Sequence, residues 1–341
     1  MSDTRPGPLN LITDVAGLKV GQAEDPAART GVTVLLPDAR AVAAVDVRGG
    51  APGTRETDAL AADTLVDAVD AVVLSGGSVY GLAAADGVTA LLGSQQRGFR
   101  LAANSGAPVS PVIPAAILYD LANGGAKDWG LEPPYRALGL AAARAAGERF
   151  ALGTAGAGFG AMAGRLKGGV GSASAVAAEG FTVGAIVAVN SFGSAVAPGT
   201  RAFWAAPFEL DGEFGDLGAG DLKALPDDWG LAKGAPAAAR ENTTIACVAT
   251  DAVLTPVEAR RVAIMAQDGM ARALRPVHSP FDGDVVFALA TGRHDLPGPR
   301  PMTIARIGAL AADCLARAIA RGVYEATPWP GTPVSCWRDL R

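Results

Sequence analysis

Residues 242–250 read Asn242-Thr243-Thr244-Ile245-Ala246-Cys247-Val248-Ala249-Thr250 and mark the sharpest change of character in the chain. A polar step leads directly into an apolar run with β-branched residues, which predicts a buried strand. The preceding residues, 209–241, are punctuated by Gly, Pro and Asp and predict a flexible loop. A loop of that length inside a compact domain is usually functional or disordered. The junction between loop and strand is therefore a candidate functional position.

Thr243 at this junction is a candidate nucleophile. If the peptide bond between Asn242 and Thr243 were cut, Thr243 would carry a free α-amine beside its own hydroxyl. An α-amine titrates at about 7.7–8.0 and can serve as a base for an otherwise unreactive hydroxyl. The alternative is that Asn242 simply begins an ordinary strand. These residues alone leave both interpretations open.

Composition is typical of a soluble globular protein, with one large domain or two tightly joined ones. The chain has 341 residues, a net charge of −5, 50% hydrophobic residues and 18% charged residues. The acidic balance and scattered Lys and Arg residues argue against nucleic acid as a partner. The N-terminus lacks the pattern of a signal peptide, and no window reaches the length of a membrane span. We therefore expect a cytoplasmic protein that does not bind membranes.

Cysteine and histidine are scarce, which limits the possible chemistry. Cys247, Cys314 and Cys336 are widely spaced and predict buried free thiols rather than a metal site. The only histidines, His278 and His294, have no obvious Ser or Cys nucleophile context. Hydrolytic chemistry here would then use a carboxylate, Lys, Asn, Tyr or an amine. No metal ion is expected.

A cofactor is not expected either. The glycine-rich stretch at 153–160 includes Gly156-x-Gly158-x-x-Ala161, which formally resembles a dinucleotide-binding fingerprint. The clear strand-turn-helix context and the acidic residue that this fingerprint requires are missing.

Apolar periodicity predicts strands and helices in both halves of the chain. In the front half, we expect strands 31–36 and 41–47 to pair around a turn at 37–39. Further strands are expected at 71–74, 167–174 and 181–189, and one helix at 79–92. After residue 243 the order is strand, helix, strand, helix. Thr255 and Glu258 form a capping box for the first of these helices, and Gly322 is expected to end the second. Sheets packed under helices, an α/β or α+β fold, follow from this pattern.

Two aspartates close to the second of these strands could assist Thr243. Asp282 and Asp284 flank a glycine in a predicted turn before the strand at 285–290, so both carboxylates could point at one site. Close carboxylates repel each other unless a cation lies between them, and Lys167 is a plausible cation. The alternative is a solvated Asp-Gly turn.

Asn190 and Tyr119 complete the set of candidates. Asn190 ends a buried strand and could donate an amide hydrogen bond to an oxyanion. Tyr119 lies in the apolar segment Ile117-Leu118-Tyr119-Asp120 and could present its phenol. The alternatives are a strand-capping Asn and a Tyr that packs with its hydroxyl at the surface.

Several ordered motifs together resemble a known family over nearly the whole chain. They are Asp46-Val47-Arg48-Gly49-Gly50-Ala51-Pro52-Gly53-Thr54, Ser75-Gly76-Gly77-Ser78-Val79-Tyr80-Gly81-Leu82, Lys167-Gly168-Gly169, Asn190, Asn242-Thr243-Thr244-Ile245 and Phe281-Asp282-Gly283-Asp284. The chain resembles the L-aminopeptidase/D-esterase family of self-processing hydrolases, which includes β-peptidyl aminopeptidases and nylon-oligomer (6-aminohexanoate-oligomer) endo-hydrolases.

The resemblance implies a four-layer αββα fold over residues 1–341, self-cleaved between Asn242 and Thr243 into an α chain, 1–242, and a β chain, 243–341. It further implies that Thr243 forms an acyl-enzyme, with its own amine as base. Asn190 resembles the family's oxyanion residue, and Tyr119 its active-site tyrosine. Lys167, Asp282 and Asp284 match positions that the nylon-oligomer hydrolases use around the nucleophile.

Substrate choice stays open because the family divides at this site. The aminopeptidase branch has a Ser nucleophile and a Ser-x-Glu pair, whereas this chain has Thr243 with Asp282-x-Asp284. The expected substrates are small peptides or ω-amino-acid oligomers, and the resemblance implies a homo-oligomer, a dimer or tetramer of αβ units. Two alternatives are an ornithine acetyltransferase-like acyl transferase, which also self-cleaves before a Thr, and a non-catalytic binding subunit.

Overall fold

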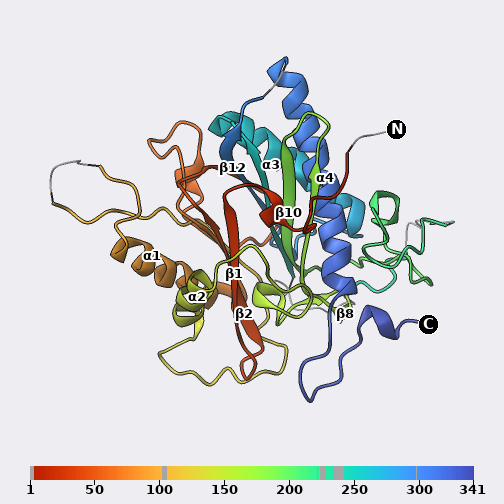
Figure 1. The fold of residues 1–341 in the computed structure, drawn as a ribbon. Helices are drawn as coiled ribbons and strands as arrows, with labels where there is room; N and C mark the ends of the chain where they lie inside the picture. The colour runs from red at the N-terminus through yellow and green to blue at the C-terminus, as the bar shows by residue number, and fades with distance from the viewer. Residues whose placement is uncertain (1–3, 102–105, 221, 223–227, 234–241, 297) are drawn as a thin grey trace.

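Two five-stranded sheets form the framework of the protein (Figure 1). The computed structural model describes residues 4–101, 106–220, 222, 228–233, 242–296 and 298–341. In spatial order, the first sheet contains β1 (Leu18–Asp25), β2 (Thr30–Pro37), β5 (Val72–Ser75), β6 (Ala115–Ile117) and β4 (Thr54–Arg55). The second contains β3 (Val42–Val47), β12 (Val285–His294), β11 (Thr243–Ala252), β10 (Thr182–Asn190) and β9 (Val170–Val176). A small hairpin joins β7 (Met162–Ala163) to β8 (Leu166–Lys167).

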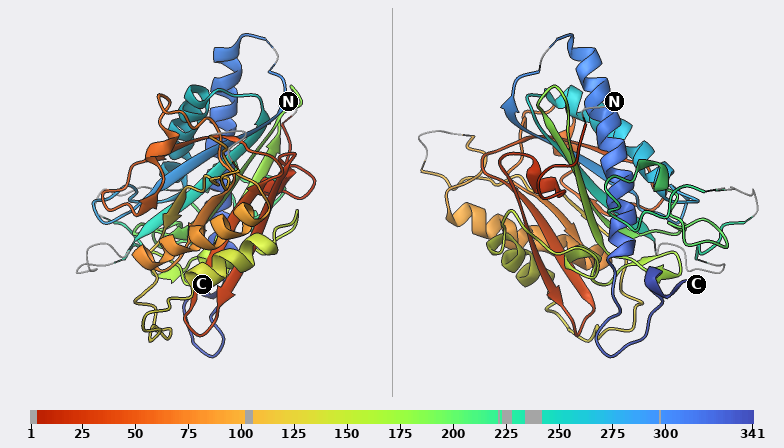
Figure 2. Two further views of the ribbon diagram at one scale, coloured as in Figure 1. Left: turned by 90° about the vertical axis from the view of Figure 1, so that its left-hand side faces the viewer. Right: turned by 45° about the vertical axis from the view of Figure 1, so that its right-hand side comes forward.

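The sheets stack face to face, and a pair of helices covers each outer face (Figures 1 and 2). Helices α1 (Ala84–Ser94) and α2 (Tyr135–Arg144) pack on the first sheet, and α3 (Pro256–Ala273) and α4 (Arg300–Tyr324) on the second. Between the sheets, apolar side chains of both interdigitate in one core, including Leu35, Leu74, Ile186, Ile245 and Phe287. The predicted four-layer αββα fold is confirmed.

Strand β11 is buried along its entire length because it lies inside the second sheet, between β10 and β12. Its side chains alternate between two cores. Ile245 and Cys247 point to the core between the sheets, while Ala246 and Val248 point to the core under α3 and α4. This double burial explains why the middle of the strand, residues 245–249, is continuously apolar rather than alternating.

Helix α3 begins where its sequence predicts. The Thr255 hydroxyl accepts a hydrogen bond from the Glu258 backbone N–H, and the Glu258 carboxylate accepts one from the Thr255 N–H at 2.8 Å. The predicted capping box is therefore confirmed. The three cysteines are also free and buried, as expected. Among the residues placed by the structure, no helix is long and apolar enough to cross a membrane.

The predicted pairing of strands 31–36 and 41–47 is wrong. β2 pairs with β1 and β5, whereas β3 pairs with β12 in the other sheet. The turn between them carries the chain from one layer to the next. Turn residues indicate that the chain reverses direction, but not which sheet the next strand joins. Strands buried on both faces also lack the alternation of polar and apolar residues that would specify a pairing partner.

Helix α4 does not end at Gly322 but continues to Tyr324. Gly322 instead lies where the helix approaches strand β9: a Cβ atom there would come within 3.0 Å of the Gly171 backbone nitrogen. On the strand, a Cβ on Gly171 would clash with the Ala318 carbonyl oxygen at 1.8 Å. These glycines serve close packing of helix against sheet, which the sequence pattern cannot distinguish from a helix stop.

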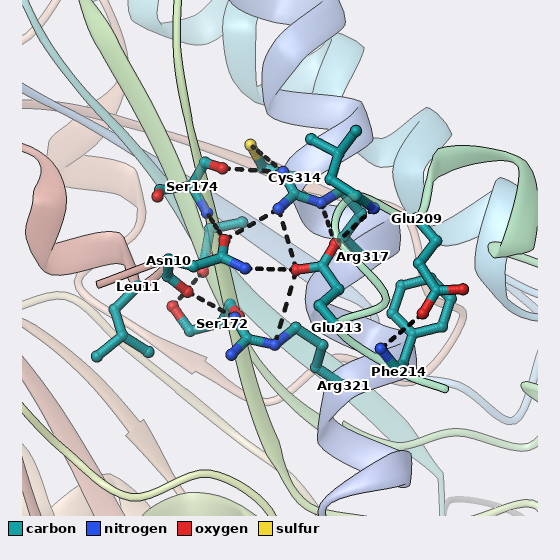
Figure 3. Close-up of polar contacts among 12 residues, drawn as sticks. Asn10, Leu11, Ser172, Ser174, Glu209, Glu213, Phe214, Cys314, Arg317 and Arg321 are labelled. Carbon is teal, nitrogen blue, oxygen red and sulfur yellow. Dashed lines mark hydrogen bonds and ion pairs between the residues drawn. The ribbon is translucent and has the colours of Figure 1, made fainter. Parts of the chain in front are cut away.

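The segment that precedes β11 is anchored by a buried ion pair (Figure 3). The described part of 209–241 forms no helix or strand, and residues 221, 223–227 and 234–241 lie outside the described residues. Within it, the Glu213 carboxylate lies 2.5 Å from the Arg317 guanidinium of α4, and both side chains are almost fully buried. Asn10 donates a further hydrogen bond to Glu213 at 2.6 Å. Residues around 213 are thus fixed to the helix layer.

Candidate active site

Three chain segments meet at one end of the second sheet, around Thr243. Thr243 is the first residue of β11 and pairs with Asn190, the last residue of the antiparallel strand β10. Because β11 and β12 run parallel, the turn before β12 lies at the same end. Asn242 and Asp282 form a parallel bridge there. The sheet topology therefore assembles Thr243, Asn190 and the 282–284 turn, as the sequence predicts.

The peptide bond between Asn242 and Thr243 is held by two donors. The Gly283 backbone N–H donates to the Asn242 carbonyl oxygen at 3.0 Å, and the Thr243 hydroxyl donates to the same oxygen. A Cβ on residue 283 would lie 2.7 Å from the Thr243 Oγ1, so glycine is required for this close approach. The hydroxyl of Thr243 thus lies beside the carbonyl that it would attack.

Both aspartates of the 282–284 turn are buried and bind surrounding donors. Asp282 accepts hydrogen bonds from the Phe192 N–H at 3.1 Å and from the Ser279 hydroxyl at 2.6 Å. Burial raises the pKa of the Asp282 carboxyl, and the negative charge of Asp284 raises it further, while these hydrogen bonds oppose the shift. The prediction of two close carboxylates is confirmed, and the alternative of a solvated turn is wrong.

Asp284 connects the nucleophile's strand to a histidine. Its Oδ1 accepts from the Thr244 N–H at 2.8 Å, and its Oδ2 lies 2.9 Å from the His278 Nδ1. Sequence reasoning missed His278, because no Ser or Cys nucleophile neighbours it. Its position six residues before Asp284, across a proline-containing loop, follows no helix or strand period that could have indicated contact.

The side-chain amide of Asn190 is fixed by two backbone groups. Its Oδ1 accepts from the Met162 N–H at 2.8 Å, and its Nδ2 donates to the Tyr119 carbonyl oxygen at 2.9 Å. Tyr119 therefore contributes its main chain to the site as well as a place on the wall of the adjoining cleft. Fixed orientation is what an oxyanion donor needs, since it avoids reorganisation during reaction.

Lys167 does not lie between the two aspartates, so that prediction is wrong. Its ammonium is fully buried and donates to the carbonyl oxygens of Gly158 at 3.1 Å, Ala161 at 3.0 Å and Gly168 at 2.6 Å. Burial lowers its pKa to about 7. Strand β8 directs the side chain into the turns around β7, where backbone carbonyls rather than carboxylates surround it.

A single peptide group connects Lys167 to Asn190. The carbonyl of the Ala161–Met162 peptide accepts from the Lys167 ammonium, and the N–H of the same peptide donates to the Asn190 Oδ1. Lys167 can therefore influence the site through the orientation and polarisation of this peptide. The sequence motif identified the residue, but its contact partners depend on backbone geometry that no side-chain pattern encodes.

A cleft of about 560 Å³ opens onto Thr243. Its wall includes the loop 50–54, Ser78, Val79, Leu82, Ile117 and Tyr119. The loop is fixed against the aspartate turn, because the Ala51 N–H donates to the Asp282 carbonyl at 2.8 Å. The residues that line this cleft in the described parts of the chain carry no formal charge. A somewhat larger cavity, about 600 Å³, lies beside α4 and does not include Thr243.

Within the ranges that the structure describes, no three His, Cys, Asp or Glu side chains are grouped so that they could hold a metal ion.

Comparison with known proteins shows the family to which the chain belongs. The family model of peptidase family S58 matches residues 10–334. An uncharacterized aminopeptidase of Mycobacterium tuberculosis is 46% identical, with 97% of this chain and 98% of the relative covered. A 6-aminohexanoate-oligomer endohydrolase of Kocuria sp. is 30% identical, with coverage of 91% and 84%.

Solved structures show the same fold at lower sequence identity. A β-aminopeptidase of Burkholderia sp. superposes with a TM-score of 0.71 at 24% identity, covering 100% of this chain and 94% of that one. The L-aminopeptidase D-Ala-esterase/amidase of Ochrobactrum anthropi, described as a variant of the Ntn-hydrolase fold, gives 0.69 at 23% identity, with coverage of 97% and 90%.

The stacked sheets and their helix layers thus have the αββα fold of a structure that is described as a variant of the Ntn-hydrolase fold. The chain belongs to peptidase family S58 and is a hydrolase of amide or peptide bonds. Membership favours hydrolysis over the acetyl-transferring and non-catalytic alternatives.

Proposed function

We propose that the chain is a self-processing amidohydrolase that cuts its own Asn242–Thr243 bond and then uses Thr243 as an N-terminal nucleophile. The observation that carries the proposal is the pair of hydrogen bonds on the Asn242 carbonyl oxygen. One comes from the Thr243 hydroxyl, and the other from the Gly283 N–H at 3.0 Å. A backbone donor on the carbonyl stabilises the negative charge that develops there during attack.

Self-cleavage balances without a co-reactant other than water. The Thr243 Oγ forms a bond to the Asn242 carbonyl carbon, the C–N bond to Thr243 breaks, and the hydroxyl proton ends on the released nitrogen. Water then hydrolyses the ester, which gives the Asn242 carboxylate and a Thr243 with a free α-amine. The products are the α chain, 1–242, and the β chain, 243–341.

The free amine completes the mature site. On a substrate amide, it accepts the Thr243 hydroxyl proton as Oγ attacks the carbonyl, and it returns a proton to the leaving amine. We infer that the Asn190 amide, which hydrogen bonds to Met162 and Tyr119 hold in one orientation, donates to the oxyanion. Water then releases the acyl group and restores Thr243.

Small peptides and ω-amino-acid oligomers are the substrate class that the cleft favours. The lining is uncharged and mixes small, apolar and hydroxyl-bearing residues, which suits an amide chain without charged side chains. One relative is named an aminopeptidase and another a 6-aminohexanoate-oligomer endohydrolase, so their names cover both kinds of proposed substrate. Assembly into a dimer or tetramer of αβ units and a cytoplasmic location stay predictions, testable by light scattering and cell fractionation.

Denaturing electrophoresis with intact-mass measurement tests the proposal. The purified wild type should give two fragments whose masses correspond to 1–242 and 243–341, and should hydrolyse at least one of a panel of α-peptides, β-peptides and aminohexanoate oligomers. Thr243→Ala should remain one chain without amidase activity. Thr243→Ser, the matched control that keeps a hydroxyl, should be cleaved. A wild type that is active as one intact chain would refute the proposal.

A further inference from the structure

His278 makes two contacts with one carboxylate oxygen beside the nucleophile. Its backbone N–H donates to the Asp284 Oδ2 at 3.1 Å, and its ring Nδ1 lies 2.9 Å from the same oxygen. A carboxylate without a proton only accepts hydrogen bonds, so the tautomer that pairs with it carries its ring proton on Nδ1. The Asp284 side chain is almost fully buried, and the His278 side chain is 19% exposed. Both partners are thus shielded from competing water.

The backbone of His278 is held in an unusual conformation to make both contacts. Its φ angle is +54°, in the left-handed region that few non-glycine residues adopt. Such a conformation persists only where its surroundings impose it, and it is frequent at functional sites. Here it turns the N–H and the ring toward the same oxygen.

Asp284 and its chain neighbour Gly283 bind backbone groups on both sides of the Asn242–Thr243 bond. Its second oxygen holds the N–H of Thr244, the residue after the nucleophile, at 2.8 Å. Its chain neighbour Gly283 supplies the N–H that binds the Asn242 carbonyl. A shift of the Asp284 carboxylate would therefore move the nucleophile's strand relative to the carbonyl donor.

His278 also places a basic side chain beside the aspartate pair. Within the described part of the chain, it is the one basic side chain within ion-pair distance of either Asp282 or Asp284. Lys167, the candidate from sequence, binds backbone carbonyls instead.

We propose that His278 is a positioning residue: it orients Asp284 through a hydrogen bond from Nδ1, and thereby sets the geometry of Thr243 for self-cleavage and for turnover. The inference rests on the proposed function. It assigns to His278 no direct contact with substrate, so substrate binding should depend little on the ring.

Three substitutions at one position test this role. His278→Ala and His278→Phe remove the Nδ1 donor, and Phe keeps the bulk of a ring. His278→Asn keeps a nitrogen donor near the position of Nδ1, and Asn tolerates positive φ better than most residues. His294→Asn is the matched control, since the His294 ring packs near Phe181, at the far end of the sheet from Thr243.

The readouts are the rate of self-cleavage of freshly made protein, and kcat and KM of the mature enzyme. His278→Ala and His278→Phe should slow cleavage and lower kcat by about ten- to a hundredfold, the range expected for loss of a hydrogen bond to a charged group. KM should change less than about twofold, because the His278 ring makes no contact with the substrate in this proposal and substrate binding is therefore retained. His278→Asn should recover most of the rate, and His294→Asn should match the wild type.

Wild-type rates in His278→Ala would overturn the proposal, as would His278→Asn behaving no better than His278→Phe. If His278→Ala does not fold, the comparison of His278→Asn with His278→Phe still tests the proposal, provided that thermal melting shows both variants to be folded. Failure of the proposed function looks different: there the wild type itself stays uncut, or Thr243→Ala is cut. The two ideas are therefore separable.

Discussion

Asn190 lies directly opposite Thr243 in the antiparallel register of β10 and β11. One residue ends its strand and the other begins its strand, so the register sets them opposite each other at one end of the sheet without any loop between them. A site built on paired strands is held more precisely than one built on loops. The candidate oxyanion donor and the candidate nucleophile are thus placed by sheet register alone.

Loss of the Asn190 amide should therefore lower turnover strongly. Asn190→Ala is expected to reduce kcat by about a hundred- to a thousandfold, the range for removal of one oxyanion donor. Asn123→Ala is the control, because Asn123 lines the same small cavity as Asn190 but donates to the Arg29 carbonyl. Steady-state kinetics on the best substrate would check this. Equal rates for the two variants would argue against the role of Asn190.

Gly283→Ala should impair self-cleavage by crowding. The added Cβ would lie 2.7 Å from the Thr243 Oγ1 and must displace either the hydroxyl or the turn. Overpacking of this kind costs about 1–3 kcal/mol of unfolding free energy. Gly147→Ala is a matched control, since a Cβ there meets no atom within 4 Å. A time course of fragment appearance on denaturing gels, together with urea unfolding, separates the two variants.

Arg317→Met should destabilise the fold far more than loss of an exposed ion pair. It leaves the buried Glu213 carboxylate without its main cation, which costs about 3–5 kcal/mol. The double variant Arg317→Met, Glu213→Gln should regain part of that loss. Arg293→Met breaks the exposed pair with Asp38 and should cost less than about 1 kcal/mol. Denaturant unfolding of the four proteins at one pH provides the measurement.

Lys167 should make stability rise with pH. Its pKa is lowered from 10.5 to about 7 by burial, so between these values the unfolded chain holds a proton that the folded chain has released. The free energy of unfolding then increases with pH, by up to about 1.4 kcal/mol per pH unit. Below pH 7 the full free-energy cost of burying the Lys167 ammonium lowers the stability of the fold. Above pH 10.5 the lysine is neutral in both the folded and the unfolded chain, and this cost is absent.

Lys167→Met should lack this rise, so the difference in unfolding free energy between wild type and variant should change steadily from pH 7 to 10. Lys19→Met, which removes an exposed lysine paired with Asp38, is the control. Parallel slopes for wild type and Lys167→Met would contradict the shifted pKa. Because the same lysine holds the peptide that orients Asn190, the variant should also lose activity.

Local signals in the sequence were sufficient where the structure depends on local chemistry. Thr255 and Glu258 predict the start of α3 because a helix cap is satisfied within four residues. The apolar run after Thr243 predicts β11, since burial on both faces demands it. The layered fold and the contact of Thr243 with Asn190 follow from such elements once the family resemblance supplies their order.

Long-range choices were not predictable in the same way. β2 and β3 join different sheets, and the turn between them encodes only a reversal of chain direction. The partners of Lys167 are main-chain carbonyls, which are identical for every residue type. His278 reaches Asp284 through a left-handed backbone conformation that has no sequence pattern for a non-glycine residue.

The strand order of the second sheet, β3-β12-β11-β10-β9, places residues from after the Asn242–Thr243 bond in its interior, with earlier residues on both flanks. If that bond is cut as proposed, strands of the longer piece flank the strands of the shorter piece on both sides. Neither piece can then leave without dismantling the sheet. Dilution should therefore not dissociate the two pieces. Specific activity should stay constant down to concentrations at which an ordinary heterodimer would dissociate.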